Sequence, residues 1–186
     1  MPEIAMARRS GVLDQLQPIR KAGFSALPQP PAGRLSIRLG NADGVEAGGL
    51  DLACPLNRVV TAGTRLAARL GPDEWLIVVA AGDEQAVAKE LGAALAGGHC
   101  TMTDISHRNT AFEVAGAAAD AVLAAGCPLD LERVPQGFAT RTLLGKAEIV
   151  LIRLGDAPDG TRRYRIECWR SFGRYLHAFL TEAAAG

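Results

Sequence analysis

Alternation of apolar and polar residues predicts several strands in this chain. Leu35, Ile37 and Leu39 alternate with Ser36 and Arg38, as in a strand with one buried face. A continuous apolar run, by contrast, is typical of a strand covered on both faces, and 75–80 has this character. The predicted strands that follow the first span 75–80, 99–105, 111–114, 138–144, 147–154 and 164–168. Gly-Lys between two of them predicts a hairpin.

Apolar residues recur at the spacing of an α-helix in three segments. The first begins at Gly82 or Asp83 and ends at 97–98, the second spans 117–124, and the third follows Ser171, which we expect to be its N-cap. Apolar residues three and four positions apart predict the buried face of each helix. These residues are Val87, Leu91, Ala94 and Leu95; Ala118, Ala119, Val122 and Leu123; and Phe172, Tyr175, Leu176, Phe179 and Leu180.

The stretch 104–131 connects these elements into one packing unit. It contains a strand, a turn at His107 and Arg108, a second strand and the Ala-rich helix. Gly116 separates the second strand from the helix, and Gly126 is placed to end the helix. Strands and helices therefore alternate along the chain. This order predicts an α+β layered sandwich built from two βαβ-like halves.

In two segments the apolar residues follow neither the strand period nor the helix period. Residues 1–33 contain a few apolar positions and then Pro28, Pro30 and Pro31, which predict an extended, stiff linker. We interpret 1–33 either as a disordered tail or as an arm that lies along a partner, and 34–186 as the folded domain. Residues 41–66 are rich in Gly and Asp, so we expect mostly irregular structure there.

Composition narrows the class of protein. The 186 residues hold 20 basic and 20 acidic side chains, so no net field attracts nucleic acid or an acidic membrane surface. No apolar stretch approaches the roughly 18 residues that cross a bilayer, and no secretory core is present near the start. We expect a soluble, cytoplasmic protein. Its four cysteines form no C-x-x-C pair, which makes a structural zinc site improbable and favours reduced, buried thiols.

The first candidate functional site is a possible catalytic triad. Asp104, Ser106 and His107 lie together, but neighbours on a strand point to opposite faces and cannot align as orienter, nucleophile and base. We therefore expect structural roles. Asp104 would accept bonds from the backbone or an arginine, and His107 with Arg108 would lie at a turn or a subunit contact. The three histidines share no spacing typical of a metal site.

Other polar or aromatic residues are interface candidates. Trp75 follows the turn that contains Asp73, and we expect it to be a core or interface anchor rather than a platform for flavin or folate. Arg170 precedes Ser171 and is suited to hold a carboxylate within its own fold or on a partner. No G-x-G-x-x-G and no Walker loop supports dinucleotide binding by this chain.

Four strings, at their spacing and in their order, resemble a known family. They are GPDEWL at 71–76, DISHRNTAFEVAG at 104–116, CPLDL at 127–131 and RSFGRYL at 170–176. Together they resemble the gamma subunit of heterotetrameric sarcosine oxidase over roughly 35–183. The pattern is also similar, more distantly, to the amino-terminal module of the glycine-cleavage T-protein, an aminomethyltransferase that binds folate. The resemblance implies a T-protein-like sheet-and-helix fold.

The same resemblance implies a non-catalytic, structural role in a complex. That complex demethylates sarcosine oxidatively to glycine, forming hydrogen peroxide and, with folate, methylenetetrahydrofolate. FAD and FMN would lie on a beta subunit, NAD and the tetrahydrofolate site on or near an alpha subunit, and zinc on a delta subunit, with no cofactor on this chain.

Two alternatives stay open. One is the equivalent subunit of an N-methylglutamate dehydrogenase-type complex. The other is a free-standing folate enzyme, for which the chain lacks the T-protein's later domain and its acidic pair after a Gly-rich turn.

Overall fold

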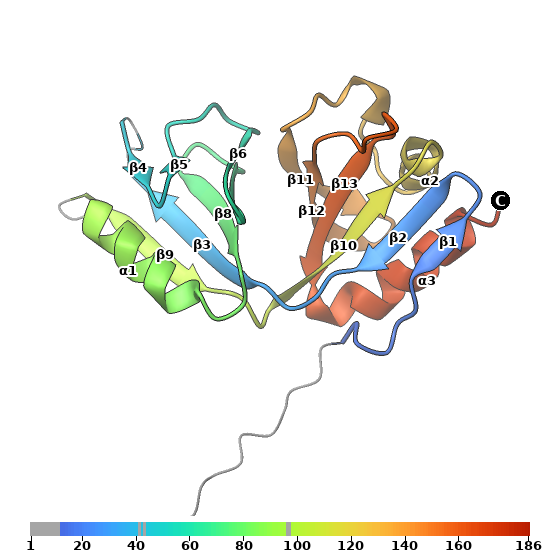
Figure 1. Cartoon of the computed structure of the whole chain (residues 1–186), viewed down its shortest axis with the longest axis horizontal. Helices are drawn as coiled ribbons and strands as arrows, with labels where there is room; N and C mark the ends of the chain where they lie inside the picture. Colours follow the sequence, from blue (N-terminus) through green and yellow to red (C-terminus); the bar gives the residue numbers. More distant parts are fainter. Residues whose placement is uncertain (1–11, 41, 43, 96–97) are drawn as a thin grey trace, which may run out of the picture.

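Two large antiparallel sheets dominate the described part of the molecule, and they approach each other at one end (Figure 1). The structure is a computed structural model and describes residues 12–40, 42, 44–95 and 98–186. The chain starts in one sheet, passes through the whole of the other, and returns to the first. Each sheet contributes a strand–helix–strand step, so the predicted α+β class is confirmed.

The first sheet has six strands in the order β1-β2-β10-β13-β12-β11. Its central pair, β10 and β13, stays in register over seven residues from Asn109↔Trp169 to Ala115↔Arg163. Gly145 turns the β11–β12 hairpin with a positive φ of 60°, as the Gly-Lys step predicts. The six strands are β1 (Ile19–Lys21), β2 (Phe24–Pro28), β10 (Asn109–Ala115), β11 (Ala139–Leu144), β12 (Ala147–Arg153) and β13 (Arg163–Trp169).

The second sheet has five strands in the order β6-β7-β8-β3-β9. β8 and β9 both pair with β3, and the helix between them crosses one face of this sheet. The strands are β3 (Gly33–Leu39), β6 (Val59–Ala62), β7 (Arg65–Arg69), β8 (Glu74–Val79) and β9 (Cys100–Asp104). A short ribbon of β4 (Glu46–Ala47) and β5 (Leu50–Asp51) lies at its end.

The helices cover the outer faces of the two sheets (Figure 1). α2 (Ala119–Ala124) and α3 (Gly173–Ala183) pack on the six-stranded sheet, and α1 (Glu84–Ala94) packs on the five-stranded sheet. Two short 3-10 turns, η1 (Leu131–Arg133) and η2 (Arg170–Phe172), complete the elements. No helix in the described part of the chain is long and apolar enough to span a bilayer.

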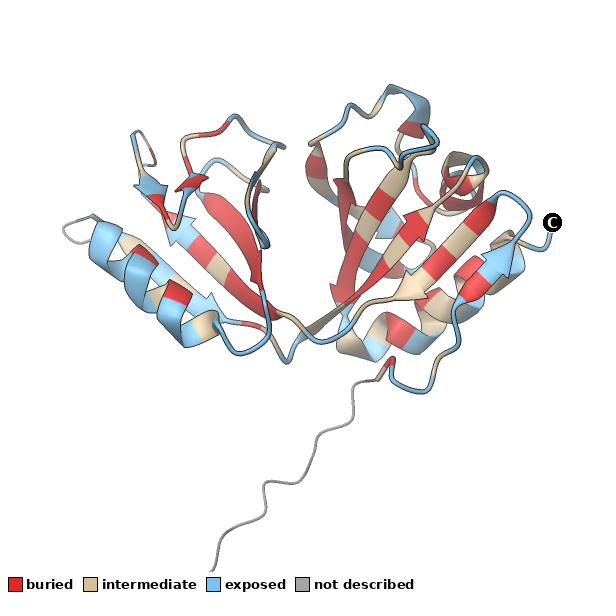
Figure 2. Ribbon diagram, in the orientation of Figure 1, coloured by how far each residue is buried: buried red, intermediate tan, exposed pale blue. Residues whose placement is uncertain are grey.

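Three apolar clusters hold these layers together, and Figure 2 shows buried residues along both sheets. The largest lies between the six-stranded sheet and α2 with α3, and a second lies under α1. The third joins the facing sides of the two sheets through Leu76 and Val78 on β8 and Val150 and Ile152 on β12. The edges β6 and β11 are also linked, because the Val59 N–H donates to the Gly137 carbonyl at 2.8 Å.

Residues 12–33 differ from the expected arm or linker. They contribute β1, β2 and the start of β3, and β2 pairs with β10 in the six-stranded sheet. Phe24 and Ala26 alternate into the core, a pattern too short to stand out beside the prolines that follow. The part of the expected arm at 1–11 lies outside the described residues, as does 97 at the predicted end of the first helix.

One local prediction is incomplete and another is wrong. Residues 41–66 are mostly irregular where the structure describes them, as expected, but they also contain the short strands β4, β5 and β6 and the start of β7. Gly63, with φ 57°, permits the tight β6–β7 turn. Ser171 is not an N-cap. It lies inside the 3-10 turn η2, the helix begins at Gly173, and no side chain caps it. The stripe predicted for α3 is confirmed, with Leu176 and Leu180 buried.

Candidate functional site

Asp104 and Ser106 form a small hydrogen-bonded turn where β9 leaves the sheet. The Ser106 hydroxyl donates to the Asp104 carboxylate at 2.5 Å, and the Ser106 backbone N–H donates to the same oxygen at 2.8 Å. Ser106 Oγ in turn accepts a bond from the Arg34 N–H at 2.9 Å. The bonds from Ser106 lower the pKa of Asp104. These contacts fasten the end of β9 to β3, and the bond from the Ser106 N–H is a backbone bond of the kind expected for Asp104.

A buried ion cluster lies beside this turn, between the two sheets. Arg34 on β3 and Glu167 on β13 are each 1% exposed, and Arg34 Nε donates to the Glu167 carboxylate at 2.6 Å. Arg165 Nε donates to the other oxygen of Glu167 at 2.8 Å. One carboxylate therefore compensates the buried Arg34 and the partly buried Arg165, and its bond to Arg34 connects two sheets through residues 133 positions apart.

Several of the predicted interface residues gather around a small cavity of about 120 Å³ next to Arg34. Ser106, His107 and Arg170 line it, together with residues from 12–14 and 29–31. Arg108 lies beside the cavity, and its carbonyl accepts a bond from the Arg170 N–H at 2.8 Å. The turn at 107–108 is thus joined to the start of η2.

The three remaining predicted residues do not line this cavity: Ser171 lies in η2, and Asp73 and Trp75 lie on or next to β8. Asp73 is exposed and accepts a bond from Arg38 at 2.9 Å. Trp75 is 1% exposed within the cluster under α1, and the Arg69 guanidinium lies 4.9 Å from its ring centre. Its ring is therefore enclosed by its own domain. In the described part of the chain, no three His, Cys, Asp or Glu side chains are grouped to hold a metal ion.

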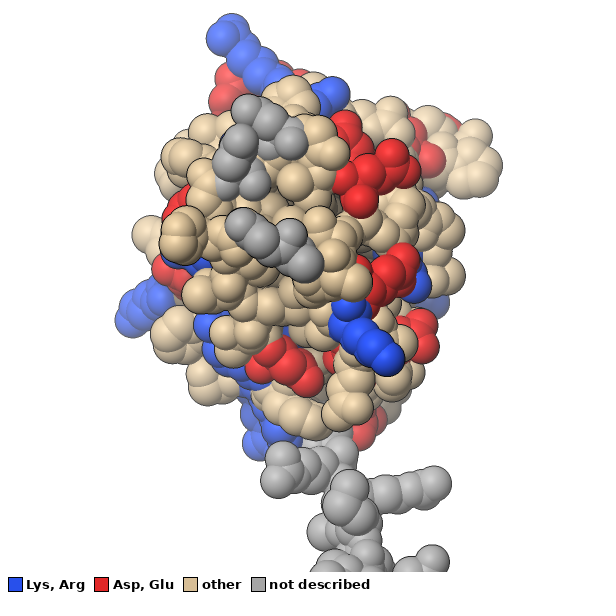
Figure 3. Space-filling model, turned by 90° about the vertical axis from the view of Figure 1, so that its left-hand side faces the viewer, with Lys and Arg blue, Asp and Glu red and all other residues tan. Residues whose placement is uncertain are grey.

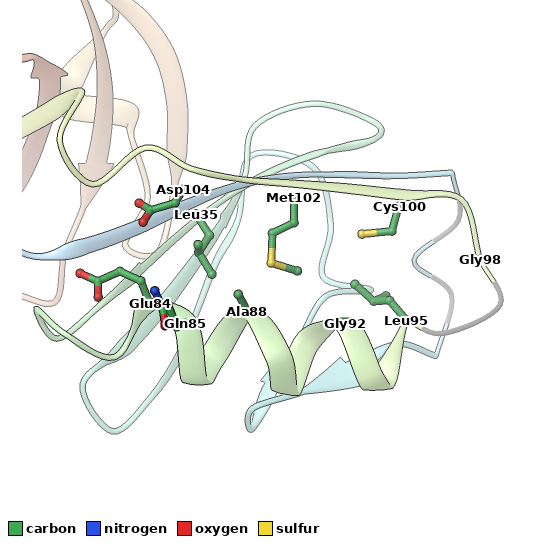
Figure 4. Close-up of a pocket in the computed structure, with 10 residues that line it drawn as sticks. All are labelled: Leu35, Glu84, Gln85, Ala88, Gly92, Leu95, Gly98, Cys100, Met102 and Asp104. Atoms are coloured by element: carbon green, nitrogen blue, oxygen red, sulfur yellow. The ribbon is translucent and has the colours of Figure 1, made fainter.

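A groove that the sequence analysis did not identify lies between α1 and β9 (Figure 4). It encloses about 520 Å³ and is lined mainly by apolar and small residues. Glu84 and Asp104 lie at one end of it, and Leu95 with Cys100 at the other (Figure 4). The signal in the sequence is Gly92, a residue that is unfavourable inside a helix and that faces open space here.

Two large apolar side chains lie in the open on the face that the six-stranded sheet turns toward its neighbour. Leu143 on β11 is 50% exposed and Trp169 on β13 is 48% exposed. The strand registers place Glu148 of β12 between them, because Leu143 pairs with Glu148 and the next residue, Ile149, pairs with Cys168. The three side chains therefore form one exposed row across β11, β12 and β13.

Known proteins share this sequence and fold. The family model of the sarcosine oxidase gamma subunit matches residues 40–186. Two curated relatives, the sarcosine oxidase gamma subunits of Arthrobacter sp. and of Corynebacterium sp. strain P-1, are each 37% identical over 91 residues. Those 91 residues make up 47% of this chain and 43% of each relative, so the match spans less than half the length of those relatives.

Solved structures show the same fold. A chain of the heterotetrameric sarcosine oxidase from Corynebacterium sp. U-96, solved with pyrrole 2-carboxylate, superposes with a TM-score of 0.80 at 22% identity and covers 95% of both chains. The glycine cleavage aminomethyltransferase T of Bartonella henselae superposes with a TM-score of 0.65 at 16% identity, over 85% of this chain and 45% of that one.

The T-protein-like architecture expected from the resemblance is therefore confirmed by these two folds. The family is established separately, by the match of its model to 40–186, which is most of the chain. The strings at 71–76, 104–116, 127–131 and 170–176 all fall inside that match. This protein belongs to the sarcosine oxidase gamma subunit family.

Proposed function

We propose that this chain is a non-catalytic, structural subunit of a heterotetrameric sarcosine oxidase. The observation that carries the proposal is the family match over residues 40–186. In this role the chain supports a complex that oxidises the N-methyl group of sarcosine, forming glycine, hydrogen peroxide and, with folate, methylenetetrahydrofolate. The chain itself contributes surfaces and rigidity to the assembly, and the complex works in the cytoplasm.

The partners in this proposal are the alpha, beta and delta subunits. FAD and FMN belong to the beta subunit, NAD and tetrahydrofolate to sites on or near the alpha subunit, and zinc to the delta subunit. The polar residues of this chain support such a division. Asp104 and Ser106 bond to each other and to β3, and Glu167 is enclosed by two arginines, so these groups stabilise the fold.

The surface of the chain also supports a subunit role. Trp169 and Leu143, each about half exposed, are the kind of side chains that are enriched or tolerated at interfaces and costly to leave in water. Asp73, His107, Arg108 and Arg170 remain interface candidates for a different reason, which is their accessible polar side chains. Their positions at turns and strand ends leave them near the surface of the fold.

Two rival functions are separated by one experiment. The tagged chain is purified from its native host, and the visible spectrum and substrate turnover of the eluate are measured. A yellow complex that turns over sarcosine supports the proposal, and one that turns over N-methylglutamate instead favours the related dehydrogenase. A colourless, isolated chain that binds tetrahydrofolate contradicts both and favours a free-standing folate enzyme, to which the T-protein-like fold lends the only support.

A further inference from the structure

β9 is the terminal strand of the five-stranded sheet, and no strand of the described residues pairs with its outer edge. The Ile105 N–H donates to the Arg34 carbonyl at 2.9 Å, and the Gly40 N–H donates to the His99 carbonyl at 3.0 Å. Backbone groups alternate along a strand, so the odd-numbered residues from 99 to 105 bond to β3. The N–H and C=O groups of Cys100, Met102 and Asp104 therefore point away from the sheet.

The same three residues line the groove beside α1 with their side chains (Figure 4). On the helix, the facing positions are occupied by the small residues Ala88 and Gly92. A Cβ atom added at Gly92 would meet no described atom within 4 Å, so no contact with the described residues requires glycine there. Glycine costs a helix about 1 kcal/mol relative to alanine, and its presence leaves room for another backbone or side chain to approach.

The groove has a charged end. Glu84 and Asp104 lie together there (Figure 4). In the described part of the chain, neither carboxylate forms an ion pair with Lys or Arg, although His107 is close enough to Asp104 to help lower its pKa. The rest of the lining is largely uncharged, and Figure 3 shows that most of this side of the molecule is neither acidic nor basic.

We propose that β9 and this groove bind an extended segment of a partner subunit. The segment pairs with the free edge of β9, lays apolar side chains over Ala88 and Gly92, and places a Lys or Arg against Glu84 and Asp104. At about 3.3 Å per residue, the five residues of β9 accommodate a segment of about five residues. This inference rests on the proposed function, because it takes the occupant from the partners of the complex.

A partner segment fits the site better than a second copy of this chain. Self-pairing would bring in a second β9, whose sequence Cys-Thr-Met-Thr-Asp contains no cation. Among the described residues, the Glu84 and Asp104 carboxylates would then still have no Lys or Arg partner, and two further carboxylates would be added to the interface. A basic residue on a different chain supplies the missing charge.

The test compares Gly92→Arg with Ala93→Arg in chains co-expressed with the partner subunits and purified through a tag on this chain. Both positions are exposed on α1, but only 92 lines the groove. We expect Ala93→Arg to retain wild-type amounts of flavin-containing partner and Gly92→Arg to lose at least tenfold. Because arginine is a better helix former than glycine, the Tm of the isolated Gly92→Arg chain should equal or exceed that of the wild type.

A second readout distinguishes strand pairing from simple packing. In the wild-type complex, hydrogen exchange at the Met102 and Asp104 amides should slow at least tenfold relative to the free chain, since these amides point to the free edge. Equal assembly by both variants, or unchanged exchange at these amides, would overturn the groove inference alone. Failure of the wild-type chain to recover any flavin-containing partner would overturn the proposed function, and the inference with it.

Discussion

At the scale of single residues, the chain commits its charged groups mainly to its own stability. Glu167 is the clearest case, since it is buried between Arg34 and Arg165 and connects both sheets. The negative charge of such a carboxylate offsets the free-energy cost of removing the guanidinium groups from water. Without it, these groups keep their positive charges where little water can solvate them. Asp104 plays a milder part at the surface, where two bonds from Ser106 favour its ionised form.

Replacing Glu167 with Gln should lower the free energy of unfolding by about 3–5 kcal/mol, because the buried Arg34 and the partly buried Arg165 lose their counter-charge. Urea unfolding followed by circular dichroism measures this. The matched control is Glu148→Gln, whose carboxylate is 54% exposed and lies 3.5 Å from Arg141. That change should cost no more than about 1 kcal/mol. Similar losses for the two variants would contradict a special role for Glu167.

Ser106→Ala should raise the pKa of Asp104 toward its ordinary value of 3.8, because the hydroxyl bond to the carboxylate is lost. A carboxylate whose pKa is lowered by folding adds stability above its unfolded pKa and loses it as pH falls through the folded value. The wild type should therefore have a larger free energy of unfolding than the Ser106→Ala variant above about pH 4. Part of this difference should disappear as the pH falls further and Asp104 becomes protonated in both proteins.

An NMR titration of the side-chain carboxyls provides the direct measurement of that pKa. Asp159 is an internal reference, because its pKa is lowered by bonds from Thr161 that the substitution does not touch. If Asp104 and Asp159 titrate as before in the Ser106→Ala chain, the hydroxyl bond does not set the Asp104 pKa.

At the scale of elements, close contacts between turns and helices decide where each segment begins. Gly116 lies between β10 and α2 with a φ of 123°, and a Cβ atom there would lie 2.2 Å from the Gly23 carbonyl oxygen. The turn between β1 and β2 thus presses against the start of α2. α3 begins differently, since a 3-10 turn precedes it and its first residue is a buried glycine.

Gly116→Ala should destabilise the protein by more than about 3 kcal/mol, because backbone strain and a collision with the backbone of Gly23 act together. Thermal unfolding is the simplest assay. Gly160→Ala is the comparison, since Gly160 also has a positive φ of 78° but meets nothing within 4 Å. Strain alone should cost about 1–2 kcal/mol there. Equal costs would show that the β1–β2 turn moves aside freely.

Ser171→Ala should change the free energy of unfolding by less than about 0.5 kcal/mol, because the serine is exposed and caps no helix. An N-cap serine replaced in the same way typically costs about 1 kcal/mol. Chemical denaturation resolves the two cases, and a loss of 1 kcal/mol or more would restore the capping role expected from the sequence.

At the scale of the whole molecule, the strands and helices with a regular side-chain period could be predicted from the sequence. The contacts between segments far apart in the sequence could not. The long strands and the three helices were predicted because their side-chain periods are local, and the family was recognised from short strings at fixed spacing. The pairing of β2 with β10 leaves no local signal, since it joins segments about eighty residues apart. The Arg34–Glu167 pair and the α1–β9 groove depend on the same kind of distant contact.

The path of the chain through the two sheets has a consequence for synthesis on the ribosome. β2 emerges early, but its neighbour β10 is made only after the entire five-stranded sheet, about eighty residues later. At typical translation rates of about 5–20 residues per second, β2 waits roughly 4–16 seconds with one edge unpaired. During that interval the nascent chain offers an open edge to chaperones or to other chains, so the yield of folded protein should depend on translation speed between residues 28 and 115.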